Sequence, residues 1–478
     1  MENYLGQKGY TIYKNNIHIK EQQNIRDELT VRPYIPNSVV QPNSFPVYRE
    51  SHKKMYVPRF YGEKTYGELE TTDLNEVEEI NLNFQGEMRD YQIKITETYL
   101  NHVKKTNLGG GGLLEIPCGR GKTVMALKII EQLKQKTLVI VHKGFLLNQW
   151  IERITQFLPN ARVGKIQGPY FDIKDKDIVI GMLQSLSMKE YPQSMFKSFG
   201  LTIIDECHHI SAEVFVRSLF SVVTPYMLGL SATMQRKDGL TKVFKMFIGD
   251  IVYSEKTKQE HNVLVKAIEY VTNDEEFNDV KYDYRGNPQY STMISKLCNF
   301  NHRSEFIVSV VADMVKENPE RQLMILGHNK SLLVYLHKAI EFKNIASVGY
   351  YIGGMKEKDL KLSETKKIIV ATYSMAAEAL DIKTLSGLIM VTPKTDVVQS
   401  IGRILRTKHE QPVVVDIIDQ HGIFQNQWKK RKTYYVKQGY EIIHTNNNLY
   451  KNNEWVSLNK KGETKKKKKE EPKCLIKI

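Results

Sequence analysis

The chain has 478 residues, enough for two or three domains of ordinary size. Lys and Arg total 69 against 54 Asp and Glu, and the resulting net charge of +15 favours a polyanionic partner. Four cysteines without a CxxC pair argue against a disulfide framework or a zinc module, and no apolar run approaches the roughly 18 residues of a spanning helix. We therefore expect a soluble intracellular protein.

Residues 1–80 are the first segment of the chain. They contain five prolines and many tyrosines but few periodic apolar stretches, so no fold can be predicted for them. We expect an N-terminal accessory region, which is either a substrate-binding domain or a partly ordered arm.

Residues 81–257 alternate strand-like apolar runs with helical patterns, which predicts an α/β unit with a parallel sheet. The expected strands are Leu113–Ile116, Thr137–Val141, Asp177–Gly181, Leu201–Ile204 and Tyr226–Ser231.

The segment Ile-Pro-Cys-Gly-Arg-Gly-Lys-Thr, residues 116–123, is a candidate phosphate-binding loop that opens a predicted helix. The glycines let backbone N–H groups turn inward, Lys122 would reach the β- and γ-phosphates, and Thr123 would offer its hydroxyl to Mg²⁺. The pattern usually begins with Gly, where this chain has Ile116. The candidate ATP-binding residues of this loop are Pro117, Cys118, Gly119, Arg120, Gly121, Lys122 and Thr123.

An acidic motif, Asp-Glu-Cys-His at residues 205–208, follows the strand expected at Leu201–Ile204. Open α/β sheets keep their ligands at the carboxyl ends of the strands. Asp205 is therefore a candidate Mg²⁺ ligand together with Thr123, and Glu206 is the candidate catalytic residue that orients the attacking water. One chain thus carries both halves of an ATP-hydrolysing site.

Two further segments follow. Residues 258–300 have mixed polarity and are expected to be a linker or a thumb-like insertion. Residues 301–445 predict a second α/β unit, which has no phosphate-binding loop of its own. Its expected strands are Gln322–Leu326, Val348–Ile352, Lys367–Ala371, Gly387–Val391 and Pro412–Ile417.

Arg403 and Arg406 lie three residues apart late in the second unit, so a helix would present both on one face. Two guanidinium groups directed at a γ-phosphate would act as arginine fingers when the two units close. The alternative is a solvated basic helix face.

Residues 446–478 are expected to form a disordered basic tail. From Lys460 onward the chain has nine Lys and three Glu, so +6 of the net charge of +15 lies there. The tail would be a solubilising extension, a phosphate tether or a nuclear-import signal.

The ordered motifs between Arg89 and Arg406 resemble those of superfamily 2 helicases, which implies two tandem RecA-like domains. Gln92 resembles the glutamine motif near the adenine, Asp381 belongs to a nucleotide-contacting motif, and Gln399 belongs with the two arginines to the last catalytic motif. The resemblance implies that His208, Ser231 and Thr233 couple hydrolysis to strand movement. The residues implied to contact nucleic acid are Lys143, Gln184, Thr233, Arg236, His328 and Thr372.

Within this superfamily the chain is most similar to the XPB-like DNA helicases, and the stretch from Gly229 to Phe244 resembles compact helicases of large DNA viruses, including the poxvirus transcript-release helicase. Lys237 replaces the central acid of the XPB-family Arg-Glu-Asp element. The resemblance implies an ATP- and Mg²⁺-dependent, sequence-independent 3′–5′ DNA translocase in viral transcription termination, repair or recombination, in the host cytoplasm, virion or nucleus.

Two alternatives remain open for this motor. One is an RNA, DNA–RNA hybrid or phage-type branch-migration helicase. The other is an ATPase that loads onto nucleic acid and depends on transcription or repair partners for any strong unwinding.

Overall fold

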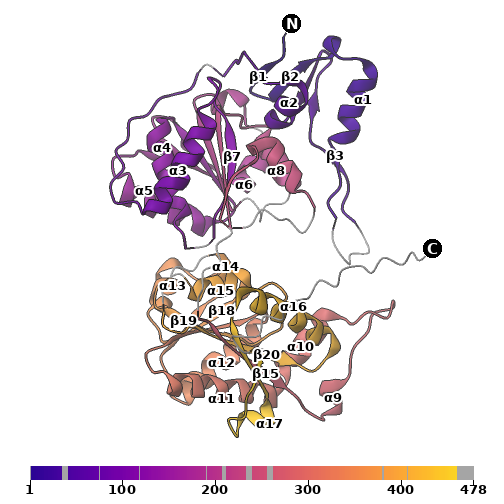
Figure 1. The fold of residues 1–478 in the computed structure, drawn as a ribbon, viewed down its shortest axis with the longest axis vertical. Helices are drawn as coiled ribbons and strands as arrows, with labels where there is room; N and C mark the ends of the chain where they lie inside the picture. Colours follow the sequence, from indigo (N-terminus) through magenta and orange to yellow (C-terminus); the bar gives the residue numbers. More distant parts are fainter. Residues whose placement is uncertain are drawn as a thin grey trace, which may run out of the picture. The chain divides into compact units, whose positions relative to one another are not determined.

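A computed structural model shows two compact units, Met1–Lys256 and Thr257–Ile478 (Figure 1). Each unit contains an eight-stranded, mainly parallel sheet, so the predicted tandem RecA-like fold is confirmed. No helix in the described part of the chain is both long and apolar enough to cross a bilayer. The structure describes residues 2–34, 41–74, 76–117, 119–189, 191–206, 212–232, 239–255, 262–378, 382–405, 407 and 409–459.

The first sheet has the strand order β10-β9-β11-β8-β12-β13-β7-β14, and only β10 runs antiparallel to its neighbour. Its strands are β7 (Gly111–Glu115), β8 (Thr137–Val141), β9 (Val163–Gln167), β10 (Tyr170–Phe171), β11 (Ile178–Met182), β12 (Leu201–Asp205), β13 (Tyr226–Ser231) and β14 (Ile251–Ser254). The helices are α3 (Asp90–Val103), α4 (Lys122–Leu133), α5 (Gly144–Phe157), α6 (Leu183–Met188), α7 (Ala212–Leu219) and α8 (Thr241–Ile248).

Both faces of this sheet are buried, which explains why its strands are apolar runs rather than alternating patterns. Consecutive residues of β7 point to opposite faces, so Leu113 packs into one core and Leu114 into the other. Helices α3, α4 and α5 cover the second of these faces, whereas α6, α7 and α8 cover the first (Figure 1). The sheet therefore holds the loops at its carboxyl edge in fixed positions.

The N-terminal region is folded and belongs to the first unit. Its four-stranded antiparallel sheet has the order β1-β2-β6-β5, and its apolar side chains, including Ile12 and Met55, share one core with Leu113 of the large sheet. Arg59 is buried and donates hydrogen bonds to the carbonyl oxygens of Pro225 (2.7 Å) and Gly109 (3.0 Å). Its elements are β1 (Tyr4–Gly6), β2 (Gly9–Tyr13), α1 (Ile19–Glu28), β3 (Thr30–Val31), β4 (Phe45–Pro46), β5 (Arg49–Glu50), β6 (Lys54–Val57) and α2 (Arg59–Tyr66).

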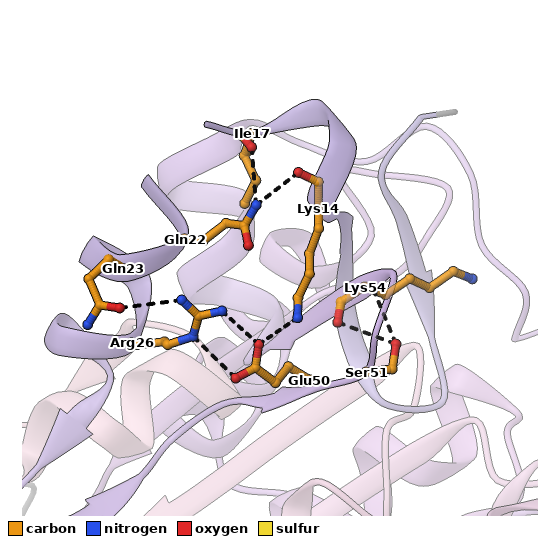
Figure 2. A network of polar contacts seen from close by, with 8 residues as sticks. All are labelled: Lys14, Ile17, Gln22, Gln23, Arg26, Glu50, Ser51 and Lys54. Atoms are coloured by element: carbon orange, nitrogen blue, oxygen red, sulfur yellow. Dashed lines mark hydrogen bonds and ion pairs between the residues drawn. The ribbon is translucent and has the colours of Figure 1, made fainter. Parts of the chain in front are cut away.

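Glu50 of the edge strand β5 pairs with two cations, Arg26 of helix α1 and Lys14 of the 3-10 turn Lys14–Asn16 (Figure 2). Its carboxylate lies 2.9 Å from Arg26 Nη2 and 2.7 Å from Lys14 Nζ, and these contacts, that of Arg26 first, lower the pKa of Glu50 to about 2. The stabilisation is therefore present above the ordinary Glu pKa and is lost as the pH falls toward 2. We expect Glu50→Gln to weaken this edge by about 1 kcal/mol at pH 7, after allowance for solvent screening.

Hydrogen exchange of β5 and β6 between pH 7 and pH 3 measures this effect. The wild-type protein should lose protection on acidification, whereas Glu50→Gln should be weakened at pH 7 and lose less of its protection as the pH falls. Asp27→Asn on the same helix is the matched control, since the Asp27 carboxylate accepts a hydrogen bond from Gln23 at 2.8 Å. Equal pH profiles for wild type and Glu50→Gln would contradict the assignment.

The second sheet has the strand order β17-β18-β16-β19-β20-β15-β21-β22. Its strands are β15 (Leu264–Tyr270), β16 (Gln322–Gly327), β17 (Val348–Tyr351), β18 (Ile368–Thr372), β19 (Leu385–Met390), β20 (Val413–Asp419), β21 (Glu441–Asn446) and β22 (Val456–Asn459). The helices are α9 (Glu275–Asn278), α10 (Tyr290–Asn299), α11 (Asn301–Glu317), α12 (Lys330–Phe342), α13 (Glu357–Glu364), α14 (Tyr373–Glu378), α15 (Val398–Ile404), α16 (Gly422–Gln438) and α17 (Asn447–Tyr450).

The predicted linker over residues 258–300 is wrong for residues 264–270. This segment forms β15, which lies inside the second sheet and pairs in parallel with β20 and β21. Two charged residues, Lys266 and Glu269, disguise the strand in the sequence, and Lys266 forms an ion pair with Glu317 at 2.5 Å. Helices α9 and α10 then pack into the same unit through Phe277 and Met293.

The predicted tail boundary at residue 446 is also wrong. Residues 447–450 form α17, and β22 (Val456–Asn459) pairs antiparallel with β21 at the edge of the sheet. Residues 460–478 lie outside the described residues, so the basic tail stays a prediction for that part alone.

Candidate functional site

The candidate phosphate-binding loop connects β7 to α4, as the sequence predicts. Gly119 and Gly121 have φ of 79° and 80°, in the left-handed region that glycine adopts without steric cost. Gly121 is also the N-cap of α4, and a Cβ there would lie 2.4 Å from Gln92 Nε2. The glycine is therefore required both by the backbone angle and by the close approach of Gln92.

Gln92 braces the loop instead of projecting into open space. The side chain is buried, and its Nε2 donates to the carbonyl oxygen of Arg120 at 3.1 Å, while its Oε1 accepts from Arg89 N at 3.0 Å. The hydroxyl of Tyr91 donates to the same Arg120 carbonyl at 3.3 Å. The glutamine motif thus fixes the start of α3 against the phosphate-binding loop. The sequence predicts a position of Gln92 near the adenine but not this contact with the loop.

Arg120 links the loop to the end of β14. Its guanidinium lies 3.7 Å from the Tyr91 ring centroid and forms two hydrogen bonds to Glu255, 2.6 Å from Nη2 to Oε1 and 3.1 Å from Nε to Oε2. Glu255 is the last described residue before the boundary between the two units. Sequence reasoning missed this partner, because the two residues are 135 positions apart and carry no shared local pattern.

Lys122 and the acidic motif meet at the carboxyl edge of the sheet. Lys122 Nζ lies 2.6 Å from Glu206 Oε1, so the predicted lysine and catalytic glutamate are in direct contact. Glu206 follows β12 with φ of 49°, a left-handed conformation that costs a non-glycine residue about 1 kcal/mol. The strained backbone places the Glu206 side chain beside the phosphate-binding loop.

Asp205 is buried at the end of β12, and Trp150 Nε1 donates a hydrogen bond to its Oδ2 at 2.8 Å. Burial, followed by the charge of Glu206, raises the pKa of the Asp205 carboxyl, whereas Lys122 and the Trp150 N–H oppose this rise. A cation placed nearby would stabilise the ionised carboxylate. The contact with Trp150 was not anticipated.

The residues present fit a Mg²⁺ ion. The described residues contain no group of three or more His, Cys, Asp or Glu side chains that could enclose a metal. Mg²⁺ does not need such a cage, since it is commonly bound by one or two carboxylates together with substrate phosphates and water. Thr123 is partly buried at the first turn of α4, next to Lys122 in the chain.

Lys143 and Gln184 follow adjacent strands of the first sheet. Val141 at the end of β8 pairs with Met182 at the end of β11, so the residues after them share one edge. Gln184 Nε2 donates to the carbonyl oxygen of His142 at 2.9 Å, and partial burial lowers the pKa of Lys143. Ser231 is buried at the end of β13, where its carbonyl oxygen accepts from Ile116 N at 2.8 Å.

His328 and Thr372 occupy the matching edge of the second sheet. Gly327 pairs with Thr372 across β16 and β18, and His328 comes next in the chain. The ring of His328 contacts Thr392 Oγ1 through Nδ1 at 2.9 Å and lies 4.7 Å from the Tyr373 ring centroid. Desolvation, followed by the charge of Lys394, lowers the pKa of His328 to about 4 although part of the residue is exposed.

Two buried ion pairs hold the segment that contains Thr392. Arg303 pairs with Asp419 (2.6 Å) and donates to the Val391 carbonyl at 2.9 Å. Arg431 pairs in the same way with Asp416 (2.7 Å) and donates to the Lys394 carbonyl at 2.7 Å. The edge near His328 is therefore fixed on both sides of Thr392.

Arg403 lies on α15, which ends at Ile404, and its side chain is buried. The side chain of Gln399 on the same helix is not among those that the structure describes. Six other predicted site residues also lie outside the described residues, so their roles stay predictions. These are Cys118, His208, Thr233, Arg236, Asp381 and Arg406.

Sequence comparisons connect this site to known proteins. The family described as "Type III restriction enzyme, res subunit" matches residues 85–236, which include the loop and the acidic motif. A protein of Acanthamoeba polyphaga mimivirus, named as an ATP-dependent RNA helicase, is 36% identical over 447 residues, covering 91% of this chain and 85% of its own. A protein named as a helicase from Invertebrate iridescent virus 6 is 27% identical over 385 residues, covering 76% and 84%.

A similar fold occurs in S. cerevisiae Dbp5 bound to RNA and ADP BeF3, with a TM-score of 0.53, 13% identity and coverage of 75% of this chain and 91% of that one. The mimivirus relative matches nearly the full length of both chains, and its sequence identity of 36% is well above the 13% of the protein that shares the fold. The chain therefore belongs to the superfamily 2 helicases, in the group of compact ATP-hydrolysing helicases found in large DNA viruses.

Proposed function

We propose that the chain is a 3′–5′ motor that uses Mg²⁺ and ATP to unwind or remodel DNA. The observation that carries this proposal is the contact between Lys122 and Glu206 beside the buried Asp205. At one sheet edge it brings together the candidate residues that bind phosphate, orient the attacking water and hold the metal. In this proposal Asp205 and Thr123 hold Mg²⁺, which supplies charge neutralisation to the transferred phosphate.

Lys122 cannot neutralise Glu206 and the nucleotide phosphates equally at the same time. Its ammonium is 2.6 Å from the Glu206 carboxylate, and ATP brings phosphate oxygens that compete for it. Transfer of Lys122 to the phosphates releases the Glu206 carboxylate to accept a proton from the attacking water. ATP binding itself therefore prepares the catalytic residue.

The candidate nucleic-acid contacts are consistent with recognition of a backbone. Lys143 and Gln184 lie at the carboxyl edge of the first sheet, and His328 and Thr372 lie at that of the second. With a pKa of about 4, His328 is neutral at physiological pH and would act by hydrogen bonding rather than by charge. Contacts of these kinds carry no base code, so binding should be independent of sequence and weakened by salt.

DNA is the first candidate substrate because the motif resemblance is to DNA helicases. RNA or a DNA–RNA hybrid is the second, and the name of the mimivirus relative favours it. Unwinding assays on duplexes with a 3′ or a 5′ tail, made of DNA and of RNA, test the proposal. Faster ATP-dependent unwinding of the 3′-tailed DNA supports it, whereas faster unwinding of the RNA duplexes would replace DNA by RNA.

The biological setting that we propose is viral transcription termination, repair or recombination in an infected cell, with transcription or repair proteins as partners. The relatives from mimivirus and Invertebrate iridescent virus 6 support a viral setting. If all duplexes remain intact while nucleic acid still accelerates hydrolysis, a partner-dependent ATPase becomes the better description.

Arg406→Ala is expected to leave ATP affinity nearly unchanged and to remove nucleic-acid stimulation of hydrolysis. An arginine finger contributes about 10³-fold or more by neutralising charge in the transition state, and little in the ground state. ATP binding and stimulated turnover measure the two effects separately. Arg285→Ala, which removes an exposed arginine of the same unit, is the control. A change in nucleic-acid affinity alone would contradict the role.

A further inference from the structure

A buried indole N–H usually finds a hydrogen-bond partner, and the partner of Trp150 is a carboxylate of the candidate site. Its indole is buried in α5, and Nε1 donates to Asp205 Oδ2 at 2.8 Å. We propose that Trp150 is a positioning residue that orients the Asp205 carboxylate toward Mg²⁺. This inference rests on the proposed role of Asp205 as a Mg²⁺ ligand.

The torsional freedom of the Asp205 side chain gives such a residue a role. The last torsion of an Asp side chain has a broad energy profile, so a carboxylate without a fixed partner turns easily. The indole N–H can only donate, and it contacts one oxygen, Oδ2, while the backbone N–H of Glu206 also donates to the carboxylate. The Trp150 bond is the one that comes from a distant side chain, and together with the local Glu206 N–H it selects one orientation of the carboxylate.

The indole itself cannot turn. Trp150 packs in the core that covers one face of the first sheet, together with Ile154 of its own helix and Val139 and Ile203 of the neighbouring strands. Because the indole is buried in this core, apolar packing restricts the direction of the N–H. The Mg²⁺ function of the sheet edge then depends on a core residue that contacts neither nucleotide nor metal.

A competing orientation exists for the carboxylate. Lys122 is in contact with Glu206, the residue that follows Asp205 in the chain, at 2.6 Å. Without the indole N–H, Asp205 can turn toward Lys122. That turn would draw the ammonium away from the phosphates and the carboxylate away from Mg²⁺.

Trp150→Phe tests the proposal because it preserves an aromatic ring and removes the N–H. Loss of a residue that orients a metal ligand typically weakens metal binding or activity by 10- to 100-fold. We expect the nucleotide affinity measured in EDTA to stay unchanged. Mg²⁺ raises this affinity, and the Mg²⁺ concentration that gives half of the increase should rise on the order of tenfold in the variant. Hydrolysis should recover toward the wild-type rate at high Mg²⁺.

The matched control is Tyr99→Phe, which removes another buried aromatic donor of the same unit, the hydroxyl bonded to the Met227 carbonyl at 2.8 Å. It should lower thermal stability without changing the Mg²⁺ requirement. An unchanged Mg²⁺ requirement in Trp150→Phe, together with a lost Mg²⁺ response in Asp205→Asn, would overturn the inference alone. An unchanged Mg²⁺ response in Asp205→Asn would overturn the proposed metal site and the inference with it.

A measurement on the wild-type chain covers the case in which Trp150→Phe does not fold. The chain has three tryptophans, and Trp428→Phe and Trp455→Phe assign the remaining indole N–H resonance to Trp150. This resonance should shift when Mg²⁺ is added to the nucleotide-bound protein and return when EDTA is added. A resonance that is insensitive to Mg²⁺ would overturn the proposal.

Discussion

Replacing Lys122 with alanine is expected to abolish productive ATP binding and to lower hydrolysis by at least 10²–10³-fold, the usual cost of removing one charge-stabilising donor from an active site. The Lys122 ammonium lies 2.6 Å from Glu206 and at the first turn of α4, where the helix N-terminus already favours anions. Its removal takes away the positive charge that the β- and γ-phosphates need and leaves Glu206 without that partner. Equilibrium binding of a fluorescent ATP analogue and steady-state hydrolysis measure the two losses.

The control for Lys122 lies on the same helix. Lys128 forms an ion pair with Glu131 at 2.8 Å, so Lys128→Ala removes a lysine of α4 away from the sheet edge. It should leave ATP binding and hydrolysis unchanged. Hydrolysis by Lys122→Ala at the wild-type rate would exclude this loop as the site of the reaction.

Replacing Glu206 with glutamine should preserve ATP binding and block turnover. The substitution keeps the size of the side chain but cannot accept a proton from water, and general-base catalysis contributes about 10²–10⁴-fold. It also frees Lys122 from the ion pair, so ATP affinity should be equal to or higher than that of the wild-type chain. Binding and single-turnover hydrolysis distinguish these effects.

Glu213→Gln is the matched control, because Glu213 is an exposed carboxylate of the same unit that pairs with Arg217 at 2.5 Å. It should hydrolyse ATP normally. Undiminished turnover in Glu206→Gln would refute its assignment as the catalytic residue, and loss of ATP binding would assign it to nucleotide positioning instead.

The strands of the two sheets can be predicted from the sequence where they are buried on both faces. Each of the ten strands expected for the two units forms within two residues of its predicted ends, since continuous apolar runs such as Thr137–Val141 reflect local composition alone. The phosphate-binding loop and the acidic motif can be predicted as well, because Lys122 and Glu206 each come directly after such a strand or after the turn that follows it.

Other elements depend on partners that are distant in the chain. Strand β15 contains two charged residues, Lys266 and Glu269, and becomes recognisable only through its parallel pairing with β20, about 150 residues later. The N-terminal strands are two to five residues long, and β2 finds β6 across about 40 residues while sharing a core with the large sheet. Local periodicity of the sequence predicts neither the pairing of β15 nor that of the N-terminal strands.

The same limit applies to the site. The bonds from Trp150 to Asp205 and from Arg120 to Glu255 join residues 55 and 135 positions apart. Motifs identify Asp205 and Lys122 as reacting groups, but the residues that hold such groups are chosen by the packing of whole elements. Only the folded arrangement reveals them.

ATP hydrolysis by the purified chain, measured at fixed salt without nucleic acid and with single-stranded DNA, duplex DNA, single-stranded RNA or a DNA–RNA hybrid, tests the central claim most directly. A nucleic-acid motor predicts a low basal rate and strong stimulation, with DNA giving the larger effect. Preferential stimulation by RNA would keep the motor and change its substrate. An equal rate in all five conditions would contradict the account, because hydrolysis would then be uncoupled from any strand.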